Sequence, residues 1–169
     1  MTAVRLRRFQ EADAHALLRW IRSEEEMVMW SGPSFRWPLD VEQLMAFPDT
    51  LRVFAAIDAE TGRLAGHLRL WVAEPYRLGR FGAVLVDPEL RGRGYGSALI
   101  GAALEVAFGE LRLHRVGLGV YTQNEGARRV YEKAGFVREG LIRDAVFVNG
   151  AYWSDIEMGI LESERRAKL

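Results

Sequence analysis

The sequence predicts an α/β domain in which a mixed central β-sheet is flanked by helices. Two observations support this class: segments of helical and of strand-like periodicity follow one another along the whole chain, and strands and helices alternate in its second half. No repeat, low-complexity tract or long linker interrupts the 169 residues, so we expect a single domain over residues 1–169. With 49% hydrophobic and 27% charged residues, the composition is that of a globular protein.

In the first half, strands are predicted from alternating or β-rich runs, and helices from apolar residues that recur every three or four positions. The stretch from residue 24 to residue 48 is the hardest to interpret, because aromatic residues stand there among glycine and proline. A turn between two β-rich runs predicts a hairpin. The predicted elements are a strand over 4–8, a helix over 11–22, a short helix over 41–47 and strands over 51–57 and 63–73.

In the second half, residues 81–86 are apolar without alternation, which is expected of a strand buried on both faces. Gly135 directly follows a helical pattern and predicts the end of that helix. Asn149 and Gly150 form the strongest short hairpin signal in the chain. The predicted elements are a strand over 81–86, a helix over 94–108, a strand over 116–120, a helix over 124–134, and extended segments over 136–141, 145–148 and 152–161.

The charge and the composition exclude several classes of function. The 23 basic and 23 acidic residues cancel, so no overall field attracts nucleic acid or a membrane surface. Without cysteine, the chain has no disulfide scaffold, no thiolate–zinc site and no cysteine nucleophile. His15, His67 and His114 show no metal-ligand spacing, so we expect surface or capping roles for them and no metal. No apolar run approaches the roughly 20 residues of a membrane span and no signal-like segment is seen, so we expect a cytoplasmic protein.

A glycine-rich turn between residues 87 and 96 is the most informative segment. It follows a predicted buried strand and opens a long helix, and Gly92, Gly94 and Gly96 alternate in it. The N–H groups at a helix N-terminus favour an anion such as pyrophosphate, and glycine allows close approach. A Walker loop needs a lysine that this turn lacks, and a dinucleotide fingerprint needs a third glycine where Ser97 stands. A turn that serves backbone geometry alone is the alternative.

The pattern that this turn does fit is Q/R-x-x-G-x-G/A, through Arg91, Gly94 and Gly96. In this it resembles the acetyl-CoA-binding motif of the GNAT superfamily of N-acetyltransferases. A second block is similar to that family as well: a predicted strand is followed by N-x-x-A-x-x-x-Y, from Asn124 to Tyr131, and then by a closing Gly-Phe.

The resemblance is firm over residues 81–161 and rests on element order alone before them. The ending, residues 136–153, is similar to the Rim-type branch, which includes ribosomal-protein N-terminal acetyltransferases and many small-molecule acetyltransferases. The resemblance implies a GNAT-like fold and an enzyme that moves an acetyl group from acetyl-CoA, its cosubstrate, directly to a primary amine of a small molecule or a protein N-terminus.

The resemblance also implies roles for single residues. The strand end at Leu85 and Val86 would pair its backbone with the pantetheine arm, and Asn124 would hydrogen-bond that arm or the nearby chain. The pyrophosphate would be held by the backbone amides of Arg91, Gly92, Arg93, Gly94, Tyr95 and Gly96.

Tyr131 is the expected general acid. Attack on a thioester expels a thiolate with a pKa near that of cysteine, about 8.5, and tyrosine titrates near 10, close enough for efficient proton donation. Tyr131 stands seven residues after Asn124, so both lie on one side of a helix. The alternative is a core tyrosine on an amphipathic helix.

The general base is not identified by the sequence. In some protein-acetylating members a carboxylate lies on the strand before the second block, and the corresponding position here is Gly119. A water chain or a more distant carboxylate must then accept the proton, and Glu74, Asp87 and Asp144 are the candidates.

Trp30 and Trp37 belong to an apolar segment that we expect above the acceptor cleft, where aromatic faces could hold an apolar or cationic group. A core or interface role for this segment is the alternative. Two other readings of the whole chain stay open: a non-catalytic acyl-CoA-binding or sensing module on the same fold, and a nucleotide-binding regulatory domain. The expected partner is the amine acceptor, with neither nucleic acid nor membrane, and the interpretation allows a homodimer.

Overall fold

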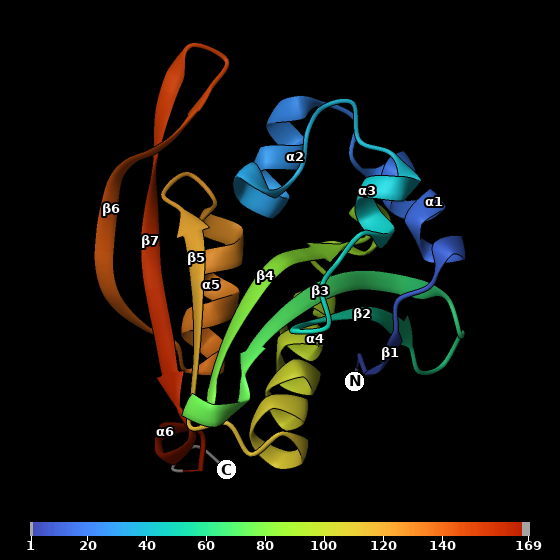
Figure 1. The fold of residues 1–169 in the computed structure, drawn as a ribbon. Helices are drawn as coiled ribbons and strands as arrows, with labels where there is room; N and C mark the ends of the chain where they lie inside the picture. Colours follow the sequence, from blue (N-terminus) through green and yellow to red (C-terminus); the bar gives the residue numbers. More distant parts are fainter. Residues whose placement is uncertain (1, 167–169) are drawn as a thin grey trace.

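The fold was taken from a computed structural model, which describes residues 2–166. Seven strands form one sheet in the order β1-β2-β3-β4-β5-β7-β6 (Figure 1). All neighbouring strands are antiparallel except β4 and β5, which are parallel. The predicted mixed sheet is therefore confirmed. The strands are β1 (Val4–Arg8), β2 (Leu51–Asp58), β3 (Leu64–Ala73), β4 (Leu78–Val86), β5 (Arg115–Tyr121), β6 (Val137–Val148) and β7 (Ala151–Leu161).

The helices lie in two layers, one on each face of the sheet (Figure 1). One core joins the sheet to α4 and α5, and a second core joins it to α1, α2 and α3. Beyond its last α-helical turn, α4 widens into a π-helical segment over Glu105–Glu110. The helices are α1 (Glu11–Trp20), α2 (Glu24–Ser31), α3 (Val41–Met45), α4 (Tyr95–Leu104), α5 (Glu125–Ala134) and α6 (Glu162–Arg166).

The segment that sequence periodicity could not resolve contains α2. Ser23 caps this helix, since its side chain accepts a hydrogen bond from the backbone N–H of Glu26 at 3.1 Å. Met27, Val28 and Trp30 of α2 are buried in the core that this helix shares with α1 and α3. The helix was missed because its apolar residues do not form a single stripe with a helical repeat.

The strand β4 is buried from both faces, as predicted. Phe81 packs in the core under α4, whereas Ala83 and Leu85 pack in the core under α1 and α2. A β-bulge produces this change of face: His67 lies opposite Leu85 and Arg69 opposite Gly82, so β4 carries one extra residue. At the bulge Ala83 has a left-handed backbone, with φ of +46°.

The strands β4 and β5 are paired at one end only. Their register runs over Leu78–Arg80 of β4 and Arg115–Gly117 of β5, and the strands then separate toward the top of the view in Figure 1. In the described chain no strand takes the β5-facing backbone groups of residues 81–86. This opening in the sheet positions the candidate site. Within residues 2–166, no helix has the length and apolar character needed to cross a bilayer.

Candidate functional site

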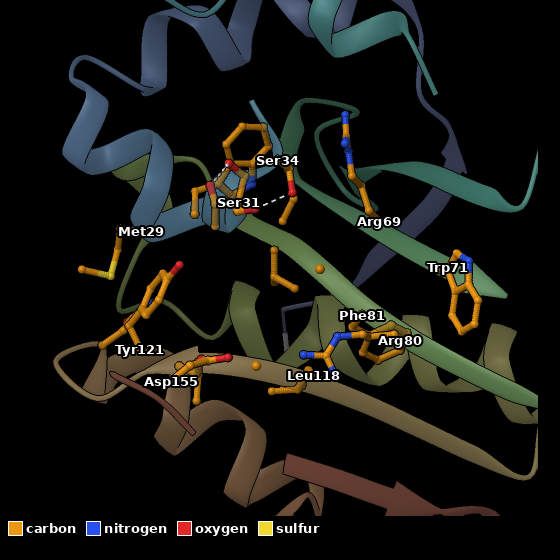
Figure 2. Close-up of a pocket in the computed structure, with 18 of the residues that line it drawn as sticks. Met29, Ser31, Ser34, Arg69, Trp71, Arg80, Phe81, Leu118, Tyr121 and Asp155 are labelled. Carbon is orange, nitrogen blue, oxygen red and sulfur yellow. Dashed lines mark hydrogen bonds between the residues drawn. The ribbon is translucent and has the colours of Figure 1, made fainter. Parts of the chain in front are cut away.

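A cavity of about 390 Å³ lies where β4 and β5 separate (Figure 2). Its walls come from four parts of the fold: residues 69 and 71 of β3, residues 80–84 of β4, residues 118–121 of β5, and residues 29–34 at the end of α2. Leu51, Asn124, Tyr131 and Asp155 complete the lining. The cavity is large enough for a small substrate and opens beside the unpaired edge of β4.

The helix α5 brings Asn124 and Tyr131 to this cavity together, as their spacing predicted. Asn124 caps the helix: its Oδ1 accepts a hydrogen bond from the backbone N–H of Ala127 at 3.2 Å. Gly135 ends the helix with a left-handed backbone. Tyr131 is 6% exposed and its ring packs edge-on against Phe136, with centroids 5.9 Å apart. Burial raises the pKa of Tyr131 well above its usual value, so the hydroxyl stays protonated at neutral pH.

Asp155 of β7 is a carboxylate in the cavity that sequence analysis did not identify. It fills the space beside Gly119: a Cβ at residue 119 would come closer than 3.0 Å to Asp155 Oδ2. Burial raises the pKa of Asp155, and the neighbouring charge of Glu157 raises it further. Arg80 opposes this shift, but its guanidinium is already bound to both carboxylate oxygens of Glu157, at 2.7 and 2.8 Å.

The register of β5 and β7 explains why Asp155 escaped detection. Antiparallel pairing places Asp155 opposite Tyr121 and Glu157 opposite Gly119. The hairpin signal at Asn149 and Gly150 correctly marks the turn between β6 and β7. It does not reveal that β7 inserts between β5 and β6, and only that insertion brings Asp155 to the cavity.

The three carboxylates considered as bases from the sequence do not line this cavity. Glu74 is exposed and pairs with Arg52 at 3.2 Å. Asp87 is buried and bound to Arg63 at 2.6 Å. Asp144 lies in β6, where its backbone N–H bonds to the hydroxyl of Ser154 at 3.1 Å. The sequence left a water chain and a distant carboxylate both open as the proton acceptor, and none of the three carboxylates that it suggested reaches this cavity.

The glycine turn at the start of α4 has the open backbone that its motif predicted. Gly92 and Gly94 have φ values of +75° and +88°, which favour glycine, and Gly94 is the N-cap of α4. A Cβ at Gly92 would meet nothing within 4 Å, and the side chains of Arg91 and Arg93 are exposed. The turn therefore presents helix N-terminal amides to solvent, in an arrangement that suits an anion.

Two residues of this motif also have structural roles. A Cβ at Gly96 would lie 3.4 Å from the side chain of Val130, so this glycine lets α4 approach α5 closely. The Tyr95 hydroxyl donates a hydrogen bond to the Asp58 carboxylate, and this bond, together with those from Thr61 and Glu60, lowers the pKa of Asp58 to about 2. The side chain of Tyr95 thus ties α4 to the end of β2.

Leu85 and Val86 form the end of β4 and lead into the glycine turn. One backbone edge of this strand end faces β3, and the other faces away from it. Toward β3, Val86 is in register with Gly66 and Leu85 with His67. Their opposite edge has no strand partner in the described chain. Neither residue lines the cavity itself.

Of the two tryptophans predicted to contact the acceptor, only Trp30 reaches the cavity. Trp30 is 8% exposed and stacks on Phe35, with ring centroids 5.4 Å apart. Trp37 is 41% exposed and is not part of the cavity lining. The apolar segment thus contributes both to the core and to the wall of the cavity.

His67 is not a surface or capping residue, and that expectation was wrong. Its side chain is fully buried, and Nδ1 lies 2.8 Å from the carbonyl oxygen of Ala83 at the β4 bulge. The rings of Phe9 and Trp30 contact it edge-on, at 5.0 and 5.4 Å between centroids. Desolvation lowers the pKa of His67 to about 3, so the imidazole is neutral at pH 7.

The comparison with known families decides the assignment. The model of the acetyltransferase (GNAT) domain matches residues 3–137, most of the chain. This chain belongs to the GNAT acetyltransferase family. The predicted family and the GNAT-like fold are thereby confirmed.

Three relatives illustrate the similarity. Spermidine N(1)-acetyltransferase of Vibrio cholerae is 38% identical over 81 residues, which cover 48% of this chain and 47% of the relative. The L-amino acid N-acetyltransferase of Escherichia coli is 34% identical over 114 residues, or 66% of this chain and 68% of the relative. A Bacillus subtilis protein named as a ribosomal N-acetyltransferase is 34% identical over 79 residues, 47% of this chain and 43% of that protein, in agreement with the resemblance to the Rim-type branch.

The similarity in structure extends further than the similarity in sequence. The matched segment spans about half the length of the first of these curated relatives. In contrast, the crystal structure of the Vibrio cholerae spermidine N-acetyltransferase with CoA and spermine superposes with a TM-score of 0.84. That match has 27% identity and covers 96% of this chain and 98% of the other.

Proposed function

We propose that this protein transfers an acetyl group from acetyl-CoA directly to a primary amine of a small molecule or of a protein N-terminus. The observation that carries the proposal is the cavity between β4 and β5, where an unpaired strand edge, Tyr131 and Asp155 meet. Membership of the family supports the class of reaction. Two relatives are named for acetylation of spermidine and of L-amino acids, both of which are amines.

In this proposal acetyl-CoA binds along the open edge of β4. The backbone of Leu85 and Val86 pairs with the pantetheine arm, because an extended chain can complete a strand edge. Asn124 uses Oδ1 to cap α5 and keeps its Nδ2 donors for the same arm. The pyrophosphate lies at the N-terminus of α4, on the backbone amides of Arg91, Gly92, Arg93, Gly94, Tyr95 and Gly96.

The reaction is a direct attack on the thioester. The amine nitrogen bonds to the carbonyl carbon, the C–S bond breaks, and the products are the N-acetylated amine and CoA. Asp155 takes a proton from the amine; its raised pKa makes it a better proton acceptor than an ordinary aspartate. Tyr131 donates its hydroxyl proton to the departing thiolate. Without cysteine, the chain has no thiol to carry the acetyl group as an enzyme intermediate.

A thiol-release assay tests the proposal. Purified protein with acetyl-CoA is mixed with a panel of primary amines, and free CoA is followed together with the N-acetylated product by mass spectrometry. We expect amine-dependent CoA release with one product molecule for each CoA. Tight binding of acetyl-CoA by calorimetry without release with any amine would leave the non-catalytic acyl-CoA-binding module as the better interpretation. Tighter binding of ATP or NAD than of CoA would favour the regulatory domain.

A cytoplasmic location and a homodimer belong to the same proposal. The absence of cysteine suits a reducing compartment. The homodimer is supported by apolar side chains on the β6–β7 hairpin that are 46% to 65% exposed. Light scattering tests this assembly. The residues concerned are Val137, Leu141, Ile142, Phe147 and Tyr152.

A further inference from the structure

Arg69 is a buried cation in the wall of the cavity, and no carboxylate among the described residues pairs with it. The residue is 9% exposed, and its Nε and Nη2 atoms are buried without a hydrogen-bond partner. Its guanidinium lies over the ring of Phe35, with Cζ 4.4 Å from the centroid. Desolvation lowers the pKa of Arg69 to about 10, a value at which it still carries its charge at pH 7.

Two other arginines, one in the cavity wall and one near the glycine turn, do have a carboxylate partner. Arg80 and Arg63 each contact a carboxylate oxygen, at 2.7 and 2.6 Å. A buried charge without a partner is unfavourable, because it loses its hydration and gains no hydrogen bond in return. The cation–π contact with Phe35 offsets part of this cost but satisfies none of the N–H donors.

A second side chain with an unsatisfied donor lies in the same wall. The indole Nε1 of Trp30 is buried and has no hydrogen-bond partner in the described chain. Trp30 stacks on Phe35, the ring that also contacts Arg69. The wall therefore holds unsatisfied N–H donors on both Arg69 and Trp30, which call for acceptor atoms. For Arg69 the matching group is an anionic oxygen, and the planar guanidinium matches a carboxylate better than any other common group.

We propose that Arg69 binds a carboxylate of the acceptor, so that the acceptor is a small amino acid whose amine receives the acetyl group. The inference rests on the proposed function and specifies its substrate class. Asp155 and Arg69 lie on opposite sides of the cavity in Figure 2, and the side chain of Arg69 extends away from Asp155. An amino acid fits this polarity, with its amine beside Asp155 and its carboxylate beside Arg69. A polyamine would instead bring a further positive charge toward an unpaired arginine, which opposes binding.

Matched pairs of acceptors test the inference on the unmodified protein. Each of the L-amino acids is compared with its own carboxamide, which keeps the amine and the side chain and removes the anionic charge. Spermidine, and an amine that carries a phosphate in place of the carboxylate, complete the panel. For the preferred amino acid we expect a kcat/KM about 10²-fold above that of its carboxamide, because the amide leaves a buried charge unpaired.

Variants assign the effect to the residue. Arg69→Met should raise the acceptor KM about 10²-fold and abolish the preference for acid over amide, with the KM for acetyl-CoA unchanged. Arg69→Lys keeps a charge and should retain part of the preference. Arg52→Met is a control, because Arg52 lies on the neighbouring strand outside the cavity and pairs with Glu74. If Arg69→Met does not fold, the matched acceptor pairs on the unmodified protein still decide.

The results separate the two proposals. Equal turnover of acid and amide, or a preference for spermidine or for the phosphate-bearing amine, would overturn the assignment of an amino acid and leave acetyl transfer intact. If no amine reacts, the proposed function fails. Calorimetry of the acid and amide pairs on the CoA-loaded protein would then test Arg69 by itself, and equal binding of the two would refute its role.

Discussion

Gly119→Ala is a one-methyl test of the role of Asp155. The new Cβ would come closer than 3.0 Å to Asp155 Oδ2 and lie 3.1 Å from Arg80 Nη2. The end of a side chain yields more easily than backbone, so the carboxylate should move by about 1 Å while the fold remains. A misplacement of that size can lower a rate about 10²-fold, and we expect a loss of kcat of this order.

The neighbouring glycine on β5 is the matched control. A Cβ at Gly117 would meet its nearest atoms at 3.7 Å, which is ordinary van der Waals contact. Gly117→Ala should therefore keep its kcat. Both variants are assayed by thiol release at saturating acetyl-CoA and acceptor, after thermal denaturation has established that they fold equally well.

The pH dependence separates a lost base from other damage. If Asp155 accepts the amine proton, the defect of Gly119→Ala should shrink as the pH rises toward the pKa of the amine, because the amine then loses its proton without help. Full activity of Gly119→Ala at pH 7, or a defect that is constant with pH, would refute the assignment. Asp155→Asn should reproduce the same pH profile with a larger loss.

Three further predictions concern the acid, the turn and the buried histidine. Tyr131→Phe should lower kcat about 10²–10³-fold with an unchanged KM for acetyl-CoA; full turnover where chemistry limits the rate would make Tyr131 a packing residue. Gly94→Val should raise the Kd of CoA at least about tenfold, because φ of +88° strains a β-branched residue, whereas Gly101→Ala in the same helix should bind normally by calorimetry. The pKa of His67 is about 3 in the folded state and 6.5 in the unfolded state, so the unfolded state takes up a proton first as the pH falls below 6.5. The free energy of unfolding should therefore fall by about 2 kcal/mol between pH 7 and pH 5. Urea denaturation at these two pH values should show that loss in the unmodified protein and in a His15→Gln control, but not in His67→Gln; equal losses in all three would contradict the burial argument.

Much of this fold could be predicted from the sequence, because its signals are local. The apolar run at residues 81–86, the glycines after it and the Asn124 cap each act within one or two turns of chain. The helix α2 was missed because its burial depends on distant segments: it packs against β4 and shares one core with α1 and α3. His67 was misjudged for a similar reason: nothing near it in sequence shows that Phe9, Trp30 and a strand bulge enclose it.

The residues of the candidate site also differ in whether local sequence places them. Tyr131 and Asn124 could be found because a single helix spaces them. Asp155 and Arg69 could not, because each reaches the cavity through strand pairing that brings distant segments together. Trp37 was predicted above the acceptor cleft from its aromatic neighbours, and its side chain is not part of the lining of this cavity. Composition identifies an apolar segment and does not tell which of its side chains line a site.

Because β4 and β5 pair over a short register, the sheet has two parts. One part contains β1 to β4 and carries Arg69, and the other contains β5, β7 and β6 and carries Asp155. Among the described strands, backbone pairing joins the two parts over Leu78–Arg80 alone, and the side chain of Arg80 adds two bonds to Glu157 of β7. The contact of Gly96 with Val130 links the helices behind them. A thioester substrate bound between β4 and β5 would contact both parts of the sheet. Its presence would then fix how far the two strands separate, and with it the distance between Arg69 and Asp155 that an acceptor must span.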